Sequence, residues 1–208
     1  MKVLFLIHID NMSLDTGKWE KMKIIGFIGS SRKEGNTTWT VNKILEGAKE
    51  QGAETQVWSF SDLEIKPCRG CLACVKGEGC VIQDDMQKIY DALKQADVLV
   101  LGSPVYMGQM TAQAKIFTDR LFAQISPRFS PKFKEENAGK KLLLVFTQGN
   151  PDSAMFQTYF DYTKHIFQLL EFDVKGLHVV AGLRTEPACE RKDLDTAMKS
   201  IGSSLVSE

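Results

Sequence analysis

Short apolar runs alternate with stretches of helical periodicity along most of this chain, and no other feature narrows the choice of folds as much. Runs of strand length predict five strands, at residues 23–29, 55–60, 97–102, 141–147 and 176–181. Between these runs apolar residues recur at helical spacing, as in Val41, Ile44, Leu45 and Ala48, and a last helix is predicted over 192–206. Such alternation builds a parallel sheet with helices on both faces.

Right-handed crossovers then favour an α/β fold, a doubly wound sandwich with five parallel strands in the order 2-1-3-4-5. In that order a ligand binds at the carboxyl ends of the first and third strands. We expect one domain over 22–208, with the cysteine-rich segment 61–82 as an insertion. Residues 1–21 precede the pattern, and an edge strand, an arm onto a partner subunit and an incidental leader remain open for them.

Charge and cysteine content narrow the classes of function. The 208 residues carry 26 basic and 26 acidic side chains, so the net charge of zero gives no reason to expect nucleic-acid binding. No apolar run approaches the roughly 18 residues of a membrane span, and 1–9 do not form a signal peptide, so we expect no membrane partner and a cytoplasmic location. Four of the five cysteines fall within 13 residues, which in a reducing compartment indicates metal or redox chemistry.

The loop after the first predicted strand, 29–38, is typical of an anion site. Ser30, Ser31, Asn36 and Thr37 surround the start of a helix, where unpaired N–H groups and the helix dipole favour negative charge. No Gly-Lys-Ser/Thr follows, so a monophosphate fits better than a triphosphate. The alternative is a hydrophilic turn with a helix cap.

Two further strand-end loops offer surfaces for a flat ring. Pro104 stiffens the first, Tyr106 offers a flat apolar face, and Gly108 permits close backbone approach. The other loop, 147–151, supplies small and amide groups for a polar ring edge. A heteroaromatic ring between these loops, with its phosphate on the first loop, would use all three, although each loop alone could be a simple turn.

Three motifs together resemble the flavodoxin-like NAD(P)H-dependent FMN reductase superfamily over residues 22–207. They are Gly29-Ser30-Ser31-Arg32-x-x-Gly35-Asn36-Thr37, Ser103-Pro104-Val105-Tyr106-x-Gly108 and Thr147-x-Gly149. The resemblance implies a flavodoxin-like fold that binds FMN, with the phosphate on Ser30, Arg32, Asn36, Thr37 and Thr38. It also implies that Pro104, Val105, Tyr106, Met107 and Gly108, with Thr147 and Gly149, border the isoalloxazine ring.

The cysteine segment has the spacing Cys68-x2-Cys71-x2-Cys74-x5-Cys80. Four thiolates without a nearby histidine suit a [4Fe–4S] cluster or tetrahedral zinc, and we expect these thiols to organise the long loop. The spacing resembles the compact motif of the iron–sulfur flavoprotein branch of the same superfamily, which couples one FMN to one cluster. Zinc, free thiols and a reversible disulfide remain open, and the distant Cys189 is expected to be a small buried apolar residue.

Other polar residues are expected to be structural. His8, His165 and His178 lie outside the strand-end motifs. Lys115, Asp119 and Arg120 are expected to form a solvated or ion-paired helix face. Asp84 or Asp85 is expected to cap a helix, with Gln87 completing a capping box. The basic loop 124–139 is either a lid over the flavin, a subunit contact or a plain exposed loop.

These features predict a flavin-dependent oxidoreductase that passes electrons from NAD(P)H or ferredoxin to a small acceptor such as a quinone or dioxygen. A [4Fe–4S] cluster at the cysteines would handle single electrons, and the resemblance implies a homodimer or homotetramer with the cluster of one chain near a neighbour's flavin. The main alternative is a cluster-free NAD(P)H-dependent FMN or quinone reductase. A flavodoxin-type carrier is disfavoured by the zero net charge, a zinc-organised binding module is remote, and no Cys-x5-Arg phosphatase motif is present.

Overall fold

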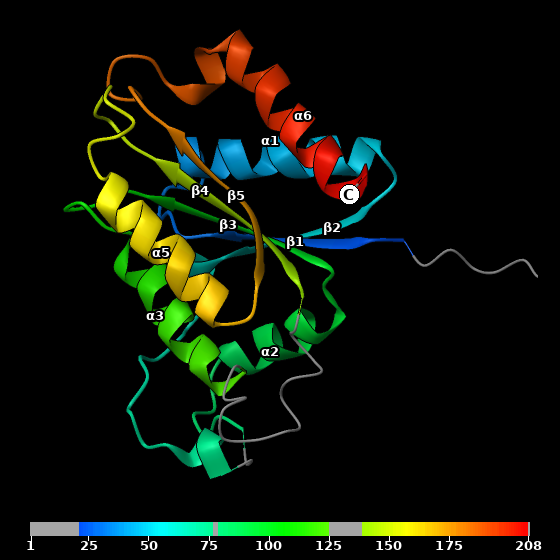
Figure 1. Cartoon of the computed structure of the whole chain (residues 1–208), viewed down its shortest axis with the longest axis vertical. Helices are drawn as coiled ribbons and strands as arrows, with labels where there is room; N and C mark the ends of the chain where they lie inside the picture. The colour runs from blue at the N-terminus through cyan, green and yellow to red at the C-terminus, as the bar shows by residue number, and fades with distance from the viewer. Residues whose placement is uncertain (1–20, 77–78, 125–138, 208) are drawn as a thin grey trace, which may run out of the picture.

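Five parallel strands form one sheet in the order β2-β1-β3-β4-β5, which confirms the predicted topology (Figure 1). The computed structural model describes residues 21–76, 79–124 and 139–207. The strands are β1 (Lys23–Ile28), β2 (Glu54–Ser59), β3 (Val98–Pro104), β4 (Lys141–Thr147) and β5 (Asp173–Val180). Their bounds agree with the sequence prediction to within two residues, except that β5 begins three residues earlier.

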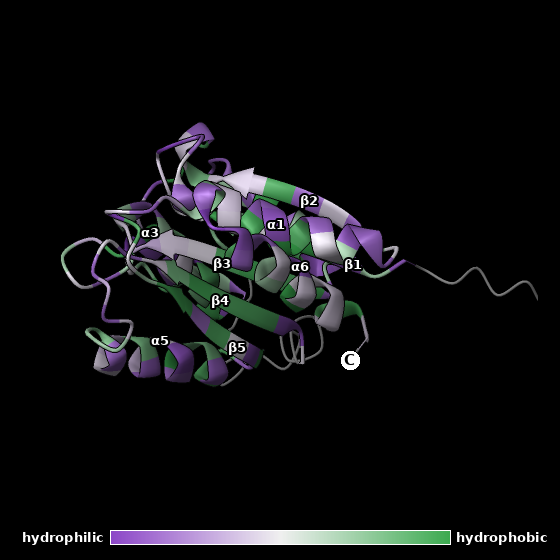
Figure 2. Ribbon diagram, turned by 90° about the horizontal axis from the view of Figure 1, so that it is seen from above, coloured by the Kyte–Doolittle hydropathy of each residue, from purple (hydrophilic) through white to green (hydrophobic). Residues whose placement is uncertain are grey.

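Helices cover both faces of the sheet, as a doubly wound fold requires (Figures 1 and 2). The helices are α1 (Asn36–Glu50), α2 (Met86–Gln95), α3 (Ala112–Arg120), α5 (Gln157–Leu169) and α6 (Lys192–Ser207). On one face α1 and α6 pack against Ile24 and Ile28 of β1, and on the other α2, α3 and α5 pack against Ile25 and Phe27. The alternation of side chains along one strand therefore supplies both cores.

Two glycines let α1 and α6 approach backbone to backbone. A Cβ atom at Gly202 would overlap the carbonyl oxygen of Ile44, and one at Gly47 would overlap the carbonyl oxygen of Lys199. The α1–α6 pair therefore depends on the absence of two side chains, which the apolar periodicity of the helices does not indicate.

The start of α2 differs from the predicted capping box. The Asp84 carboxylate does accept the backbone N–H of Met86 at 3.1 Å. The Gln87 amide instead donates to the carbonyl oxygens of Cys80 and Ile82, at 3.0 and 2.7 Å. The box is absent because Gln87 holds the end of the cysteine segment rather than the turn before its own helix.

Some sequence predictions fall outside the described residues. These concern the leader 1–20 with His8, and most of the basic loop 124–139. Among the helices that the structure describes, none is both long and apolar enough to span a bilayer.

Candidate functional site

The loop between β1 and α1 folds back on itself and exposes the start of the helix. The buried Ser30 hydroxyl accepts the N–H of Arg32 at 3.1 Å. The carbonyl oxygen of Arg32 accepts two hydrogen bonds, from the N–H of Gly35 at 3.1 Å and the hydroxyl of Thr38 at 2.9 Å. Gly35 occupies the N-cap position of α1 without a side-chain cap, so the first N–H groups of the helix remain suited to an anion.

A cavity of about 480 Å³ opens at this edge of the sheet, within the usual range of about 300–1,000 Å³ for small-ligand sites. It is bordered by the loops after β1, β3, β4 and β5. Nine of the twelve residues predicted to contact FMN line it: Ser30, Arg32, Asn36, Thr37, Pro104, Val105, Tyr106, Thr147 and Gly149. The structure therefore brings the three sequence motifs together around one space.

Three predicted residues lie beside this cavity without lining it. Thr38 uses its hydroxyl to close the first loop. Met107 and Gly108, with φ angles of 49° and 80°, form a tight turn in which Tyr106 and Gln109 exchange backbone hydrogen bonds of 2.8 and 3.0 Å. That turn leaves the Met107 side chain fully exposed and supports Tyr106, which lines the cavity.

Three predicted ligand side chains are engaged with the protein itself. The hydroxyls of Thr37 and Thr147 lie 2.6 Å apart in a buried hydrogen bond that joins α1 to the end of β4. The Asn36 side-chain oxygen accepts the N–H of Ala188, in the short helix η5 (Ala188–Glu190), at 2.9 Å. These three side chains fix the walls of the cavity.

The predicted FMN contacts omit four lining residues, Gly35, Gln148, Leu183 and Arg184. Of these, Gly35 belongs to the first motif and Gln148 to the loop expected to supply amide groups, whereas Leu183 and Arg184 were missed altogether. Leu183 and Arg184 follow β5, so the rule that ligands bind at the carboxyl ends of parallel strands would have found them. Gln148 is buried, and its amide nitrogen donates to the carbonyl oxygens of Asn150 and Asp152, which fixes its orientation. Within the described residues its side-chain oxygen has no partner, so it can accept a hydrogen bond from a ring N–H of a ligand such as FMN.

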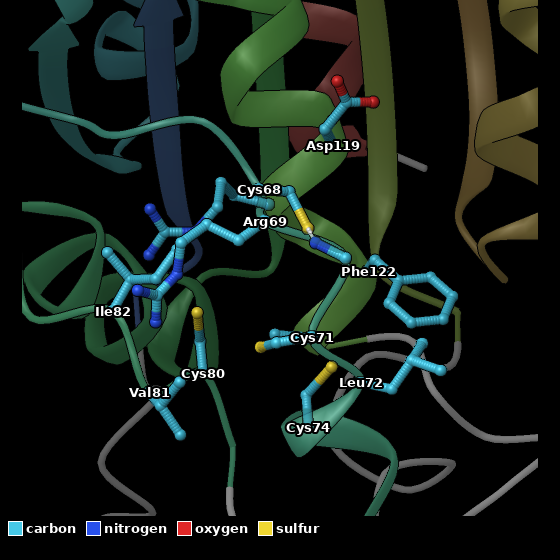
Figure 3. A pocket seen from close by; sticks show the side chains of 13 residues that line it. Cys68, Arg69, Cys71, Leu72, Cys74, Cys80, Val81, Ile82, Asp119 and Phe122 are labelled. Carbon is cyan, nitrogen blue, oxygen red and sulfur yellow. Dashed lines mark hydrogen bonds between the residues drawn. The ribbon is translucent and has the colours of Figure 1, made fainter.

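The four clustered cysteines line a second, smaller pocket of about 90 Å³ (Figure 3). Cys68 and Cys71 are exposed, whereas Cys74 and Cys80 are half-buried. Burial raises the pKa of the Cys74 thiol, and the charges of the three other thiols act in the same direction. The described residues include no group of three or more His, Cys, Asp or Glu side chains placed to hold a metal ion. Four thiols around one space nevertheless have the donor chemistry of an iron–sulfur or zinc site.

A buried ion pair helps to hold this segment, rather than the thiols alone as predicted. Arg120, only 1% exposed, binds the Asp84 carboxylate through two nitrogens at 2.6 and 3.1 Å. Burial alone would lower the pKa of Arg120, but Asp84 reverses this, and the net shift is upward. The neighbouring Lys115 and Asp119 form the exposed ion pair that the sequence indicated.

The predictions for residues outside the two pockets have different outcomes. Cys189 is exposed, so the prediction of a small buried residue was wrong. It lies in η5 on the surface, where a lone cysteine contributes no core packing. His165 is exposed on α5, and the pKa of the half-buried His178 in β5 is lowered by burial.

Three of the four loops that border the larger cavity, and most of the remaining fold, match one protein family. The profile described as NADPH-dependent FMN reductase aligns with residues 22–176, about three quarters of the chain. This chain belongs to that family. The family consists of flavin-dependent oxidoreductases, which agrees with the superfamily that the sequence motifs resemble, and the cavity at the carboxyl ends of β1 and β3 is the candidate site for FMN.

Curated relatives add a narrower likeness. An iron-sulfur flavoprotein of Methanocaldococcus jannaschii is 46% identical over 99 residues, which is 48% of this chain and 51% of that protein. A second iron-sulfur flavoprotein of the same organism is 34% identical over 142 residues, 68% of this chain and 70% of the relative. The chain thus matches about half the length of the first relative and somewhat more than two thirds of the second.

Solved structures support the fold. An NAD(P)H:quinone oxidoreductase from Methanothermobacter marburgensis superposes with a TM-score of 0.68 over 89% of this chain and 99% of that one. The sequence identity of 13% is low, so this likeness concerns the fold alone.

Proposed function

We propose that this protein is an FMN-dependent oxidoreductase that also carries a [4Fe–4S] cluster, held by Cys68, Cys71, Cys74 and Cys80. The proposed reaction passes electrons between a donor, NAD(P)H or ferredoxin, and a small acceptor such as a quinone or dioxygen. The proposed active unit is residues 22–208, assembled as a homodimer or homotetramer. The observation that carries the proposal is that four thiols line one pocket in a chain of the FMN reductase family.

In the proposed FMN site, three parts of the chain would contact the cofactor. The start of α1, with Ser30 and Arg32, would bind the phosphate, because its N–H groups and positive charge favour an anion. Val105 and Tyr106 would border the flat ring, and the free oxygen of Gln148 would accept a ring N–H. Bound FMN supplies hydride and single-electron exchange, while the protein supplies binding and orientation.

The proposed cluster site receives its support from the donor set and from the relatives. Burial raises the pKa of Cys74, and the three neighbouring thiols raise it further, so a set of thiolates in this pocket is unfavourable without a cation. Two relatives that match this chain are called iron-sulfur flavoproteins. Exposed Leu72, Val81 and Phe122 surround the pocket and would partly shield a bound cluster from water (Figure 3).

The test is anaerobic purification followed by an absorption spectrum with counts of iron, acid-labile sulfide and zinc per chain. We expect flavin bands on a broad shoulder and about four irons per chain, as a [4Fe–4S] centre requires. Cys71→Ser should lose the iron and keep the flavin. Cys189→Ser is the matched control, because Cys189 lies in η5 outside the pocket, and it should retain both.

A second candidate is a cluster-free NADPH-dependent FMN or quinone reductase, which membership of the NADPH-dependent FMN reductase family favours. It would bind FMN and turn over NADPH without iron. Flavin bands without iron or sulfide, together with NADPH turnover that survives Cys71→Ser, would replace the first proposal with this one. A colourless protein with one zinc per chain would instead favour a zinc-organised site.

A further inference from the structure

The Asp84–Arg120 pair is almost completely withdrawn from water. The two side chains are 2% and 1% exposed. Both guanidinium nitrogens that face Asp84 bind its carboxylate, at 2.6 and 3.1 Å, in the forked geometry that an arginine favours. Burying two charges is unfavourable unless they are well paired.

The pair joins the two ends of the cysteine segment. Lys66 precedes Cys68 by two residues, and its N–H donates to the Asp84 carboxylate at 2.9 Å while its carbonyl oxygen accepts from Arg120 at 2.7 Å. Asp84 itself follows Cys80 by four residues. The chain that carries all four thiols therefore leaves and returns at one buried pair, anchored on the last residue of α3.

Neighbouring bonds support the same closure. The Asp85 carboxylate accepts the N–H of Glu64 at 2.8 Å, and the Asp85 N–H donates to the Glu64 carbonyl oxygen at 3.2 Å. Gln87 holds the carbonyl oxygens of Cys80 and Ile82. Glu64, Asp85 and Gln87 do not line the pocket, whereas Arg120 both closes the segment and lines the pocket.

Arg120 retains one unused donor at this position. Its Nε–H is buried and has no hydrogen-bond partner among the described residues. An arginine has five N–H donors and a buried one is rarely left unpaired, which points to a partner absent from the protein alone. The Tyr90 hydroxyl lies beside Arg120 and donates to its carbonyl oxygen at 2.8 Å. Arg120 and Cys80 line the same pocket, so an acceptor held by the thiols would lie within the same neighbourhood.

We propose that Arg120 is a positioning residue for the cysteine site, which closes the segment through Asp84 and Lys66 and donates its Nε–H to a sulfur of the bound metal–thiolate centre. This inference rests on the proposed role of the four cysteines as ligands. Hydrogen bonds to ligand sulfur tune the properties of a metal centre, and loss of such outer partners typically lowers metal affinity about ten- to hundredfold.

The test uses the full chain, reduced and freed of metal, and titrates it with Co²⁺ while thiolate-to-metal absorption is recorded. Arg120→Met and Arg120→Lys should both bind Co²⁺ about ten- to hundredfold more weakly than the wild type. Lysine retains the charge opposite Asp84 but lacks the fork and the Nε–H, so it separates simple charge pairing from positioning. In iron-loaded protein, Arg120→Lys should also have a lower reduction potential, because it lacks an N–H donor to sulfur.

Lys94→Met is the matched control, because it removes an exposed ion pair from α2, away from the pocket. It should bind Co²⁺ as the wild type does. FMN binding reports folding, since Arg120 does not line the FMN cavity. If Arg120→Met fails to bind FMN, it is not correctly folded. The Co²⁺ affinities of Arg120→Lys and Asp84→Asn then test the inference in its place.

The outcomes are distinct. Wild-type affinity and potential in a folded Arg120→Lys would overturn the inference and leave the proposed cluster intact. A wild-type chain that binds neither Co²⁺ nor iron at its cysteines would overturn the proposed cluster, and this inference with it.

Discussion

The hydrogen bond between Thr37 and Thr147 provides a direct test of how the FMN cavity is built. The two hydroxyl oxygens lie 2.6 Å apart, and the residues are 2% and 4% exposed. Replacing one threonine by valine keeps the shape of the side chain and leaves the other hydroxyl buried without its partner. We therefore expect Thr37→Val and Thr147→Val each to lower the free energy of unfolding by about 1–3 kcal/mol.

The double variant should be more stable than the sum of the single changes predicts. When both partners become apolar groups of the same shape, no buried hydroxyl is left unpaired, and the total loss should stay below about 1 kcal/mol. The resulting interaction energy would be about 1 kcal/mol or more, measured by urea unfolding of the four proteins of the cycle. Thr40→Val is a control, because the Thr40 hydroxyl bonds only within α1, to the Asn36 carbonyl oxygen.

FMN titration of the same four proteins addresses function. If the Thr37 hydroxyl is committed to Thr147, any contact of Thr37 with the phosphate involves its backbone N–H, and the double variant should bind FMN within a few-fold of the wild type. Additive losses of stability, or a loss of FMN affinity above tenfold (about 1.4 kcal/mol) in Thr37→Val alone, would refute this reasoning. The Thr37 hydroxyl would then be assigned to the phosphate of FMN.

Three further predictions concern other parts of the molecule. Arg184→Ala removes a positive charge from the cavity wall and should weaken FMN binding at least about tenfold, by fluorescence titration; unchanged affinity would exclude Arg184 from the FMN site. Gly202→Ala should lower the free energy of unfolding by about 1–3 kcal/mol, although alanine has the better helix propensity, because the new Cβ overlaps the Ile44 carbonyl. Ser204→Ala, at an exposed position of the same helix, is the control, and a stabilised Gly202→Ala would contradict the packing argument. Burial lowers the pKa of His178, so the unfolded chain binds a proton at this imidazole more tightly than the folded chain does. The free energy of unfolding should therefore fall as the pH drops below about 6.5 and towards the folded pKa. His178→Gln should lack this pH-dependent loss in urea unfolding, and a pH profile identical to that of the wild type would contradict the prediction.

The topology and the meeting of the three strand-end motifs at one cavity were predictable because their signals are local. Strands β1, β3 and β4 are nearly continuous apolar runs, each helix has its own periodicity, and the chirality rule arranges the elements in one order. The carboxyl ends of the strands then converge at one edge, so the motifs that contain Ser30, Pro104 and Thr147 meet although they lie far apart in sequence. Arg184 was not predicted because the rule that ligands bind at the carboxyl ends of parallel strands was not applied to the fifth strand.

The contacts that hold the cysteine segment were not predictable in this way. Asp84 resembles a helix cap, and Arg120 resembles one more charge on a solvated helix face. Their pairing across 36 residues depends on where α3 ends relative to the loop, which no local pattern encodes. The same limit applies to Gln87, whose position matches a capping box while its amide binds backbone carbonyls of the cysteine segment.

Helix α3 connects the two sites that the sequence presents as separate motifs. At its start, Thr111 donates to the Gly29 carbonyl oxygen at 2.7 Å and binds the Ser103 hydroxyl through its own N–H at 3.0 Å, directly behind the loops of the FMN cavity. At its end, Arg120 lines the cysteine pocket. Nine helical residues span about 14 Å at a rise of ~1.5 Å each. Phe117 fixes the helix between them, with ring centroids 4.8 Å from Phe27 and 4.9 Å from Phe60. The separation of the two sites within one chain is therefore set by one helix, packed on the sheet through Ala114 and Phe117, rather than by the long loop that carries the thiols.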